Sequence, residues 1–122
     1  MTYIVRKANK ELKGDIYLPA SKSESNRLLV IDAILGSDDL QIENLSDSND
    51  TRVLTTALET LLQLKGTNIS VTLDMQDSGT AMRFITAFAS AINVKSLITG
   101  SERMKERPLG ILVETLKLIG AN

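Results

Sequence analysis

The 122-residue sequence contains no cysteine and no histidine. Without cysteine the chain forms no disulfide and offers no thiolate nucleophile, which fits the reducing cytoplasm, where we expect the protein to be found. Without histidine it lacks the side chain that most often acts as a general base. The two absences together argue against a structural zinc site, and we expect no bound metal.

Aromatic residues and surplus positive charge are also scarce. Two tyrosines, two phenylalanines and no tryptophan give no platform for stacking nucleic-acid bases, and a net charge of −1 lacks the basic excess of a nucleic-acid surface. No apolar run approaches the roughly 20 residues of a membrane-spanning helix, and residues 1–7 contain no apolar signal-peptide region. We therefore expect no nucleic-acid or membrane partner, and any anion site must be local.

Hydrophobic residues make up 43% of the chain and charged residues 24%, which excludes disorder and fits one globular domain. Alternating apolar residues predict strands over 3–5, 14–18, 40–43, 69–73 and 97–99. Apolar residues at helical spacing predict helices over 23–35, 50–65 (capped by Ser48 or Asp50), 79–91 and 108–119. This alternation favours an α/β layered fold with a partly parallel or mixed sheet.

The segment Leu18–Arg27 carries the strongest functional pattern. It runs from a strand into a helix for which Ser23 suits the N-cap, and a helix start attracts anions through its unpaired N–H groups. Three hydroxyls and two cations gather here: Ser21, Ser23, Ser25, Lys22 and Arg27. Serine also caps helices without binding anything, so the local chemistry leaves phosphate binding and plain capping about equally favoured. The density of hydroxyls and cations favours phosphate.

Two later segments, Asp77–Arg83 and Arg103–Pro108, also lead into helices. In the first, Gly79 allows close approach to the backbone and Thr80 can donate its hydroxyl. Taken alone, each has an ordinary explanation: an Asp-capped helix in the first and a solvated charged loop in the second. Pro108 is a good first residue for the helix that follows.

The three segments together predict one shared anion site. Ligands of open α/β sheets usually bind where strands end and helices begin. Lys22, Arg27, Arg83 and Arg107 could then surround a substrate with more than one anionic group, because arginine makes bidentate contacts to phosphate or carboxylate. The sequence has neither a Walker loop nor a Gly-x-Gly-x-x-Gly motif, so the standard nucleotide folds are disfavoured.

In order and spacing, these three segments resemble the motifs of the 5-enolpyruvylshikimate-3-phosphate synthases, also called 3-phosphoshikimate 1-carboxyvinyltransferases. The resemblance implies a transferase of the shikimate pathway, which leads to the aromatic amino acids. Such an enzyme moves the enolpyruvyl group of phosphoenolpyruvate to the 5-hydroxyl of shikimate 3-phosphate and releases phosphate. It implies these two small-molecule substrates, no metal and no cofactor, and we expect the full-length chain to be a monomer.

The family's fold is an inside-out barrel of two domains, each built from three βαβαββ units. The resemblance covers this whole chain but only the first quarter to third of the family's usual length, and the pattern stops where another strand is due. We therefore expect 1–122 to be a single N-terminal fragment that is inactive alone. Residues 1–20 would form a strand region and inter-domain crossover, and 21–122 the first βαβαββ unit and the start of the second.

On the shikimate 3-phosphate side, the resemblance implies roles for residues of the first segment. Lys22 would be the catalytic residue and would contact both substrates near the reacting hydroxyl. Ser23 and Arg27 would bind shikimate 3-phosphate. Asp50, in an acidic loop that matches the family, is a weaker candidate because a role as helix cap already explains it.

On the phosphoenolpyruvate side, the resemblance implies that the Gly79 N–H contacts the substrate, with Thr80 beside it. Arg107 would clamp the same substrate, and Arg83 would add supporting charge. The sequence departs from the family's usual pattern here, where Asn-Ala is expected in place of Asp77-Ser78. The extra negative charge puts affinity for phosphoenolpyruvate, and for its analogue glyphosate, in doubt.

Two further departures are Ala20, where the family usually has Gly, and Phe84, where it usually has Pro. One alternative function is an enolpyruvyl transferase acting on UDP-N-acetylglucosamine, but its comparable segment lacks the Ser23-x-Ser25-Asn26-Arg27 pattern. The other is a non-catalytic phosphate-binding or structural module. Binding of shikimate 3-phosphate discriminates among the three.

Overall fold

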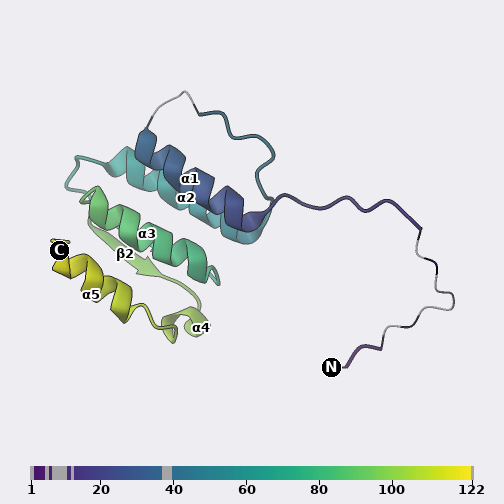
Figure 1. The fold of residues 1–122 in the computed structure, drawn as a ribbon. Helices are drawn as coiled ribbons and strands as arrows, with labels where there is room; N and C mark the ends of the chain where they lie inside the picture. The colour runs from purple at the N-terminus through teal and green to yellow at the C-terminus, as the bar shows by residue number, and fades with distance from the viewer. Residues whose placement is uncertain (1, 5, 7–10, 12, 37–39, 122) are drawn as a thin grey trace.

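The computed structural model describes residues 2–4, 6, 11, 13–36 and 40–121. Its elements, shown in Figure 1, are α1 (Lys22–Leu35), α2 (Asn49–Leu64), β1 (Val71–Asp74), α3 (Gly79–Ala91), β2 (Ser96–Thr99), α4 (Glu102–Lys105) and α5 (Gly110–Leu118). Strands and helices are mixed, as predicted for an α/β fold. Residues 37–39, between the predicted helix over 23–35 and the predicted strand over 40–43, and the predicted strand residue Val5 lie outside the described residues.

The two strands form a parallel sheet, paired from Val71 with Ser96 to Asp74 with Thr99. Helix α3 connects them, which makes a β-α-β unit of the kind that parallel pairing requires. The predicted strands at 69–73 and 97–99 are therefore confirmed, with small shifts of their ends. Because the strands are parallel, Asp74 at the end of β1 and Thr99 at the end of β2 lie at the same edge of the sheet.

Serine caps begin the three long N-terminal helices. Ser21, Ser48 and Ser78 each accept a hydrogen bond from the backbone N–H three residues further on. Ser48 and Asp50 were both predicted as possible caps of α2, and Ser48 is the one observed. The predicted cap of α1 at Ser23 is wrong, because Ser21 caps this helix, two residues earlier. Gly36, in the αL conformation (φ +59°), ends α1 at Leu35, which is the predicted last residue of this helix.

Three predicted strands do not form in the described residues. Tyr3 and Ile4, Gly14–Leu18 and Leu40–Glu43 all lack strand geometry. Residues 13–20 precede α1 and extend away from the helices (Figure 1), and the Tyr17 side chain is 94% exposed. A strand is stable only when a neighbouring strand takes up its backbone hydrogen bonds, and in the described residues the strand pairing is that of β1 with β2. In the described part of the chain, the elements that precede β1 are the helices α1 and α2.

The charged segment before the last helix contains a short helix of its own, α4. Ser101 O accepts hydrogen bonds from the N–H groups of Met104 and Lys105, and the Met104 side chain is buried. The prediction that Pro108 is the first helical residue is wrong, because α5 begins only at Gly110. The carbonyl of Pro108 instead accepts a hydrogen bond from the Arg83 guanidinium.

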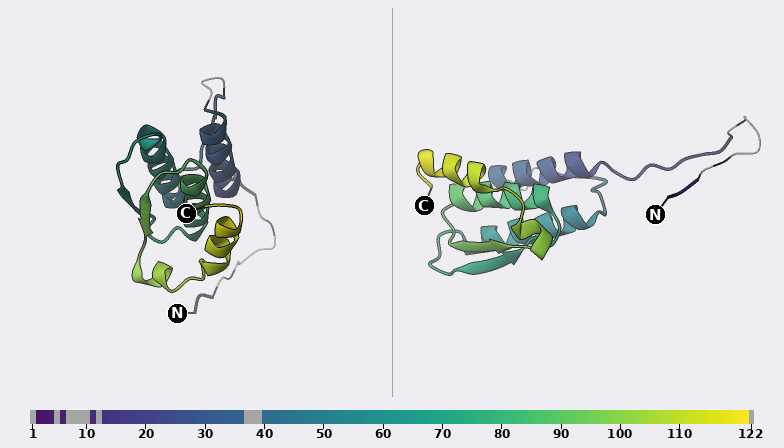
Figure 2. Two further views of the ribbon diagram at one scale, coloured as in Figure 1. Left: turned by 90° about the vertical axis from the view of Figure 1, so that its left-hand side faces the viewer. Right: turned by 90° about the horizontal axis from the view of Figure 1, so that it is seen from below.

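Helix α3 is the centre of the core and contacts α1, α2, α5 and β2, while α1, α2, α3 and α5 lie on one side of the two-stranded sheet (Figure 2). The largest apolar side chains that are fully buried are Leu54, Leu61, Met75 and Ile85. Burying each of these stabilises the fold by about 1.5–3 kcal/mol. Among the described residues, no helix is long and apolar enough to cross a membrane.

Candidate functional site

Helices α1, α2 and α3 begin at the same end of the molecule, on the right in Figure 1, and α4 lies at this end too. Both strands also run toward it. Each long helix therefore presents its first unpaired N–H groups, with their partial positive charge, toward one region. We call this end of the molecule the helix-start end. It carries the residues of all three sequence segments.

At the start of α1, Lys22 is held by an acidic neighbour. Its Nζ donates to Asp50 Oδ2 at 3.1 Å, and the two side chains are 49% and 24% exposed. Ser23 and Arg27 are exposed, and no described residue hydrogen-bonds to either side chain. The Lys22 ammonium group therefore lies beside the start of α2, whereas the side chains of Ser23 and Arg27 are exposed to solvent.

A buried polar network fixes the start of α1 against the start of α2. Asn26 Oδ1 accepts from the Thr51 hydroxyl at 2.9 Å, and Ser25 Oγ accepts from the Ser46 N–H at 2.9 Å. The Asn26 Nδ2 group is buried and has no hydrogen-bond partner among the described residues. Of the three hydroxyls predicted to surround an anion, Ser25 is buried, Ser21 is exposed but caps the helix, and Ser23 is exposed with no hydrogen bond to a described residue.

At the start of α3, two arginines lie over a buried glycine. A Cβ added to Gly79 would lie 2.9 Å from Arg107 Nη1 and 3.5 Å from Arg83 Nη1. Arg83 donates to the Gly79 carbonyl at 3.0 Å and to the Pro108 carbonyl at 3.1 Å. Gly79, Arg83 and Arg107 are thus in contact, although 28 positions separate the first from the last. Thr80 is exposed in the first turn of the same helix.

The acidic residue at the start of α3 faces the α4 loop. Asp77 Oδ1 accepts a hydrogen bond from the Ser101 hydroxyl, and Ser78, 1% exposed, caps the helix instead. The ordinary explanation that Asp77 caps α3 is therefore wrong. The extra carboxylate that distinguishes this chain from the usual family pattern is engaged by a hydroxyl donor rather than left unpaired.

The residues at the start of α1 and those at the start of α3 are linked through α2 and the turn after β1. Asn49 Nδ2, beside Asp50, donates to Gln76 Oε1 at 2.8 Å, and Gln76 precedes the α3 loop. Four cavities of about 390, 360, 330 and 200 Å³ along the described chain have neither Lys22, Gly79 nor Arg107 in their walls. Lys22, Gly79 and Arg107 therefore lie at the helix-start end, outside these four cavities.

Sequence reasoning missed several residues that organise this end, namely Asn49, Gln76 and Ser101. Each makes its contact across 24 or more positions of the chain, so no local spacing in the sequence indicates it. Asp50 had a signal in the sequence, because the Ser48 cap places it in the first turn of α2. Among the described residues, no group of three or more acidic side chains forms a possible metal site.

Fold and site define an α/β protein that gathers helix starts and cationic side chains at one end. The family model of EPSP synthase (3-phosphoshikimate 1-carboxyvinyltransferase) matches residues 6–122. The chain therefore belongs to this family.

Named relatives agree with this membership. The 3-phosphoshikimate 1-carboxyvinyltransferase of Bacteroides fragilis (strain YCH46) is 43% identical over 122 residues, 100% of this chain and 27% of that protein. Those of Ralstonia pickettii (strain 12J) and Hamiltonella defensa subsp. Acyrthosiphon pisum (strain 5AT) are 38% and 35% identical, over 92% and 88% of this chain and 29% of each relative. This chain spans little more than a quarter of the length of these relatives. No solved structure gives a significant match.

Proposed function

We propose that this chain supplies part of the active site of an enolpyruvyl transferase. The reaction joins the 5-hydroxyl oxygen of shikimate 3-phosphate to the enol carbon of phosphoenolpyruvate, breaks the bond from that carbon to the phosphate oxygen, and releases phosphate. The observation that carries the proposal is the meeting of Gly79, Arg83 and Arg107 at the helix-start end that also holds Lys22. Membership of the family gives the reaction its class.

The cations would hold two anionic substrates against their mutual repulsion. Ser23 and Arg27 are exposed at the start of α1, which makes them available to the phosphate of shikimate 3-phosphate. The Lys22 ammonium group would contact both substrates near the reacting hydroxyl. In doing so it would either break its ion pair with Asp50 or keep that ion pair alongside the substrates. Holding both reactants in one geometry removes much of the entropic cost of a bimolecular step.

Phosphoenolpyruvate would occupy the start of α3. The N–H groups of Gly79 and Thr80 begin this helix and have no helical partners, so they can donate to an anion. Arg107 already lies against Gly79, and Arg83 is fixed by two backbone carbonyls. Fixed donors of this kind stabilise charge that develops as the tetrahedral adduct forms. Arg107 would therefore clamp the substrate, while Arg83 would add supporting charge.

Because the chain spans 27% of a relative's length, we propose that it binds ligand but does not turn over alone. We also propose a cytoplasmic location and a monomeric full-length protein. Phosphate release from a mixture of the two substrates by the purified 122-residue chain would contradict the lack of turnover. Cell fractionation and light scattering test the other two statements.

The first experiment is calorimetry of the 122-residue chain with shikimate 3-phosphate. We expect heat of binding for the wild-type chain, and about tenfold weaker binding for Lys22→Met, because a charge-assisted contact is worth about 1.5–3 kcal/mol. Lys65→Met is the matched control, since Lys65 is an exposed lysine at the opposite end of α2. Heat with UDP-N-acetylglucosamine alone would favour the related transferase, and no heat with either ligand would favour a structural module.

The second experiment places Lys22→Met in a protein of the relatives' full length. We expect turnover to be abolished and the unfolding temperature to stay unchanged, because Lys22 is exposed and makes one surface ion pair. Near-normal turnover would remove Lys22 from the proposed catalytic role. Lys65→Met in the same protein should retain full activity.

A further inference from the structure

We propose that Gln76 is a positioning residue that holds the start of α2 in register with the starts of α3 and α4. The consequence for ligands rests on the proposed function, in which α1 and α2 carry one half of the anion site and α3 and α4 the other. Gln76 itself need not touch a substrate. It is exposed and lies two residues beyond the end of β1.

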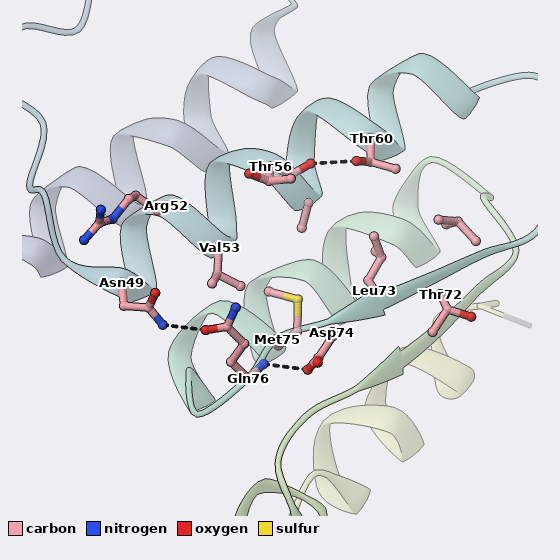
Figure 3. A pocket seen from close by; sticks show the side chains of 12 residues that line it. Asn49, Arg52, Val53, Thr56, Thr60, Thr72, Leu73, Asp74, Met75 and Gln76 are labelled. Carbon is pink, nitrogen blue, oxygen red and sulfur yellow. Dashed lines mark hydrogen bonds between the residues drawn. The ribbon is translucent and has the colours of Figure 1, made fainter.

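Gln76 makes hydrogen bonds in three directions, and Figure 3 draws the two that reach Asp74 and Asn49. Its N–H donates to Asp74 Oδ1 at 2.8 Å, and its carbonyl accepts from the Ser101 N–H at 3.0 Å. Its side-chain Oε1 accepts from Asn49 Nδ2 at 2.8 Å. One residue thereby contacts the end of β1, the loop before α4 and the first residue of α2.

The backbone of Gln76 has a φ of +51°, in the left-handed region that residues other than glycine seldom occupy. Such a conformation persists when the surroundings determine it. Met75 on one side is fully buried and Ser78 on the other is 1% exposed, so both ends of the turn are anchored. A glutamine in this position gains a side-chain contact to α2 that a glycine would lack.

The junction leaves little room to move. A Cβ added to Gly100 would lie 2.7 Å from the Gln76 carbonyl oxygen, so the turn after β1 and the loop after β2 are in close contact. Asp77, the next residue, accepts from the Ser101 hydroxyl. We therefore expect a shift of Gln76 to displace the starts of α3 and α4 together, and with them Gly79 and Arg107, which are in contact.

The hydrogen bond between Asn49 and Gln76 joins the unit formed by the starts of α3 and α4 to the first residue of α2 at the exposed end, in addition to the apolar packing of α3 against α2 in the core. Asn49 is followed by Asp50, which holds Lys22 at 3.1 Å. Loss of the hydrogen bond between Asn49 and Gln76 should leave each half of the site intact and loosen one against the other. This pattern distinguishes a positioning role from a general loss of stability.

The test compares Gln76→Ala, Asn49→Ala, the double variant and the control Gln63→Ala, an exposed glutamine further along α2. Without ligand, we expect amide hydrogen exchange at Ser101 to speed up about two- to fivefold in either single variant, as expected for loss of one exposed hydrogen bond. The double variant should be no faster than the singles. Unchanged exchange in both single variants would overturn the proposal.

The ligand measurement is a titration followed by NMR. We expect the affinity of phosphoenolpyruvate in the presence of shikimate 3-phosphate to fall about two- to fivefold, while that of shikimate 3-phosphate alone changes less than about twofold. Equal weakening of both ligands, or the same loss in Gln63→Ala, would contradict positioning. If the wild-type chain binds neither ligand, the proposed function fails, and the exchange measurement still decides the role of Gln76.

Discussion

The starts of α1 and α3 use the same local device with different surroundings. In each, a serine accepts from the N–H three residues on: Ser21 from Glu24 and Ser78 from Ala81. Ser21 is exposed and the cations beside it face solvent or Asp50, whereas Ser78 is 1% exposed and Gly79 lies beneath two arginines. The cap sets where each helix begins, but packing decides how firmly its first turn is held.

The starts of α1 and α3 are also held in place by different kinds of contact. Side chains hold the start of α1, through the buried pair of Asn26 and Thr51. Close backbone contacts hold the start of α3, through Gln76 and Gly100. We therefore expect α3 to tolerate fewer changes than α1, and the three predictions below test that contrast.

The largest effect should come from Gly100→Ala. Its Cβ would lie 2.7 Å from the Gln76 carbonyl oxygen and 3.0 Å from Met104 Cβ, so backbone must shift. We expect a loss of about 2–3 kcal/mol in the free energy of unfolding, the cost of overpacking a tight site. Denaturant titration measures it, with Gly14→Ala as the control because nothing lies within 4 Å of that position. Equal stability of the two variants would show that the junction is loose.

A smaller effect should distinguish Ser78→Ala from Ser21→Ala. Both remove a helix cap, which costs about 0.5–2 kcal/mol. We expect the upper end of this range at Ser78, because burial keeps water from replacing the lost acceptor, and the lower end at Ser21, where water can. Thermal unfolding of the two variants side by side measures the difference. A reversed order would mean that burial does not distinguish the two starts.

The smallest effect on stability should come from Gly79→Ala. The new Cβ would meet the mobile end of Arg107 at 2.9 Å, and alanine favours the helix, so we expect a change below about 1 kcal/mol. Binding of phosphoenolpyruvate should nevertheless fall about tenfold, because Arg107 must leave its place over the helix start. Gly110→Ala is the matched control, since it also begins a helix and has nothing within 4 Å. Unchanged binding would exclude Arg107 as the clamp.

Helical spacing and capping residues were enough to predict much of this molecule. The apolar periodicity of α2 and α3, and the cap at Ser48, follow from contacts within a few positions, so the sequence contains them. The motifs predicted one anion site shared by Lys22, Arg27, Gly79, Arg83 and Arg107; Gly79, Arg83 and Arg107 lie together, and the shared site stays a prediction. Family membership was predicted in the same way and is confirmed.

Tertiary structure decided what local patterns left open. The alternation in Gly14–Leu18 and Leu40–Glu43 is typical of strands, yet neither segment is a strand in the described part of the chain, and a strand exists only as one of a pair. Ser25 looked like an anion ligand and is buried against Ser46. Periodicity and caps act within one turn of helix and can be read along the chain, whereas strand pairing and the Asn49–Gln76 contact depend on segments that meet only after folding.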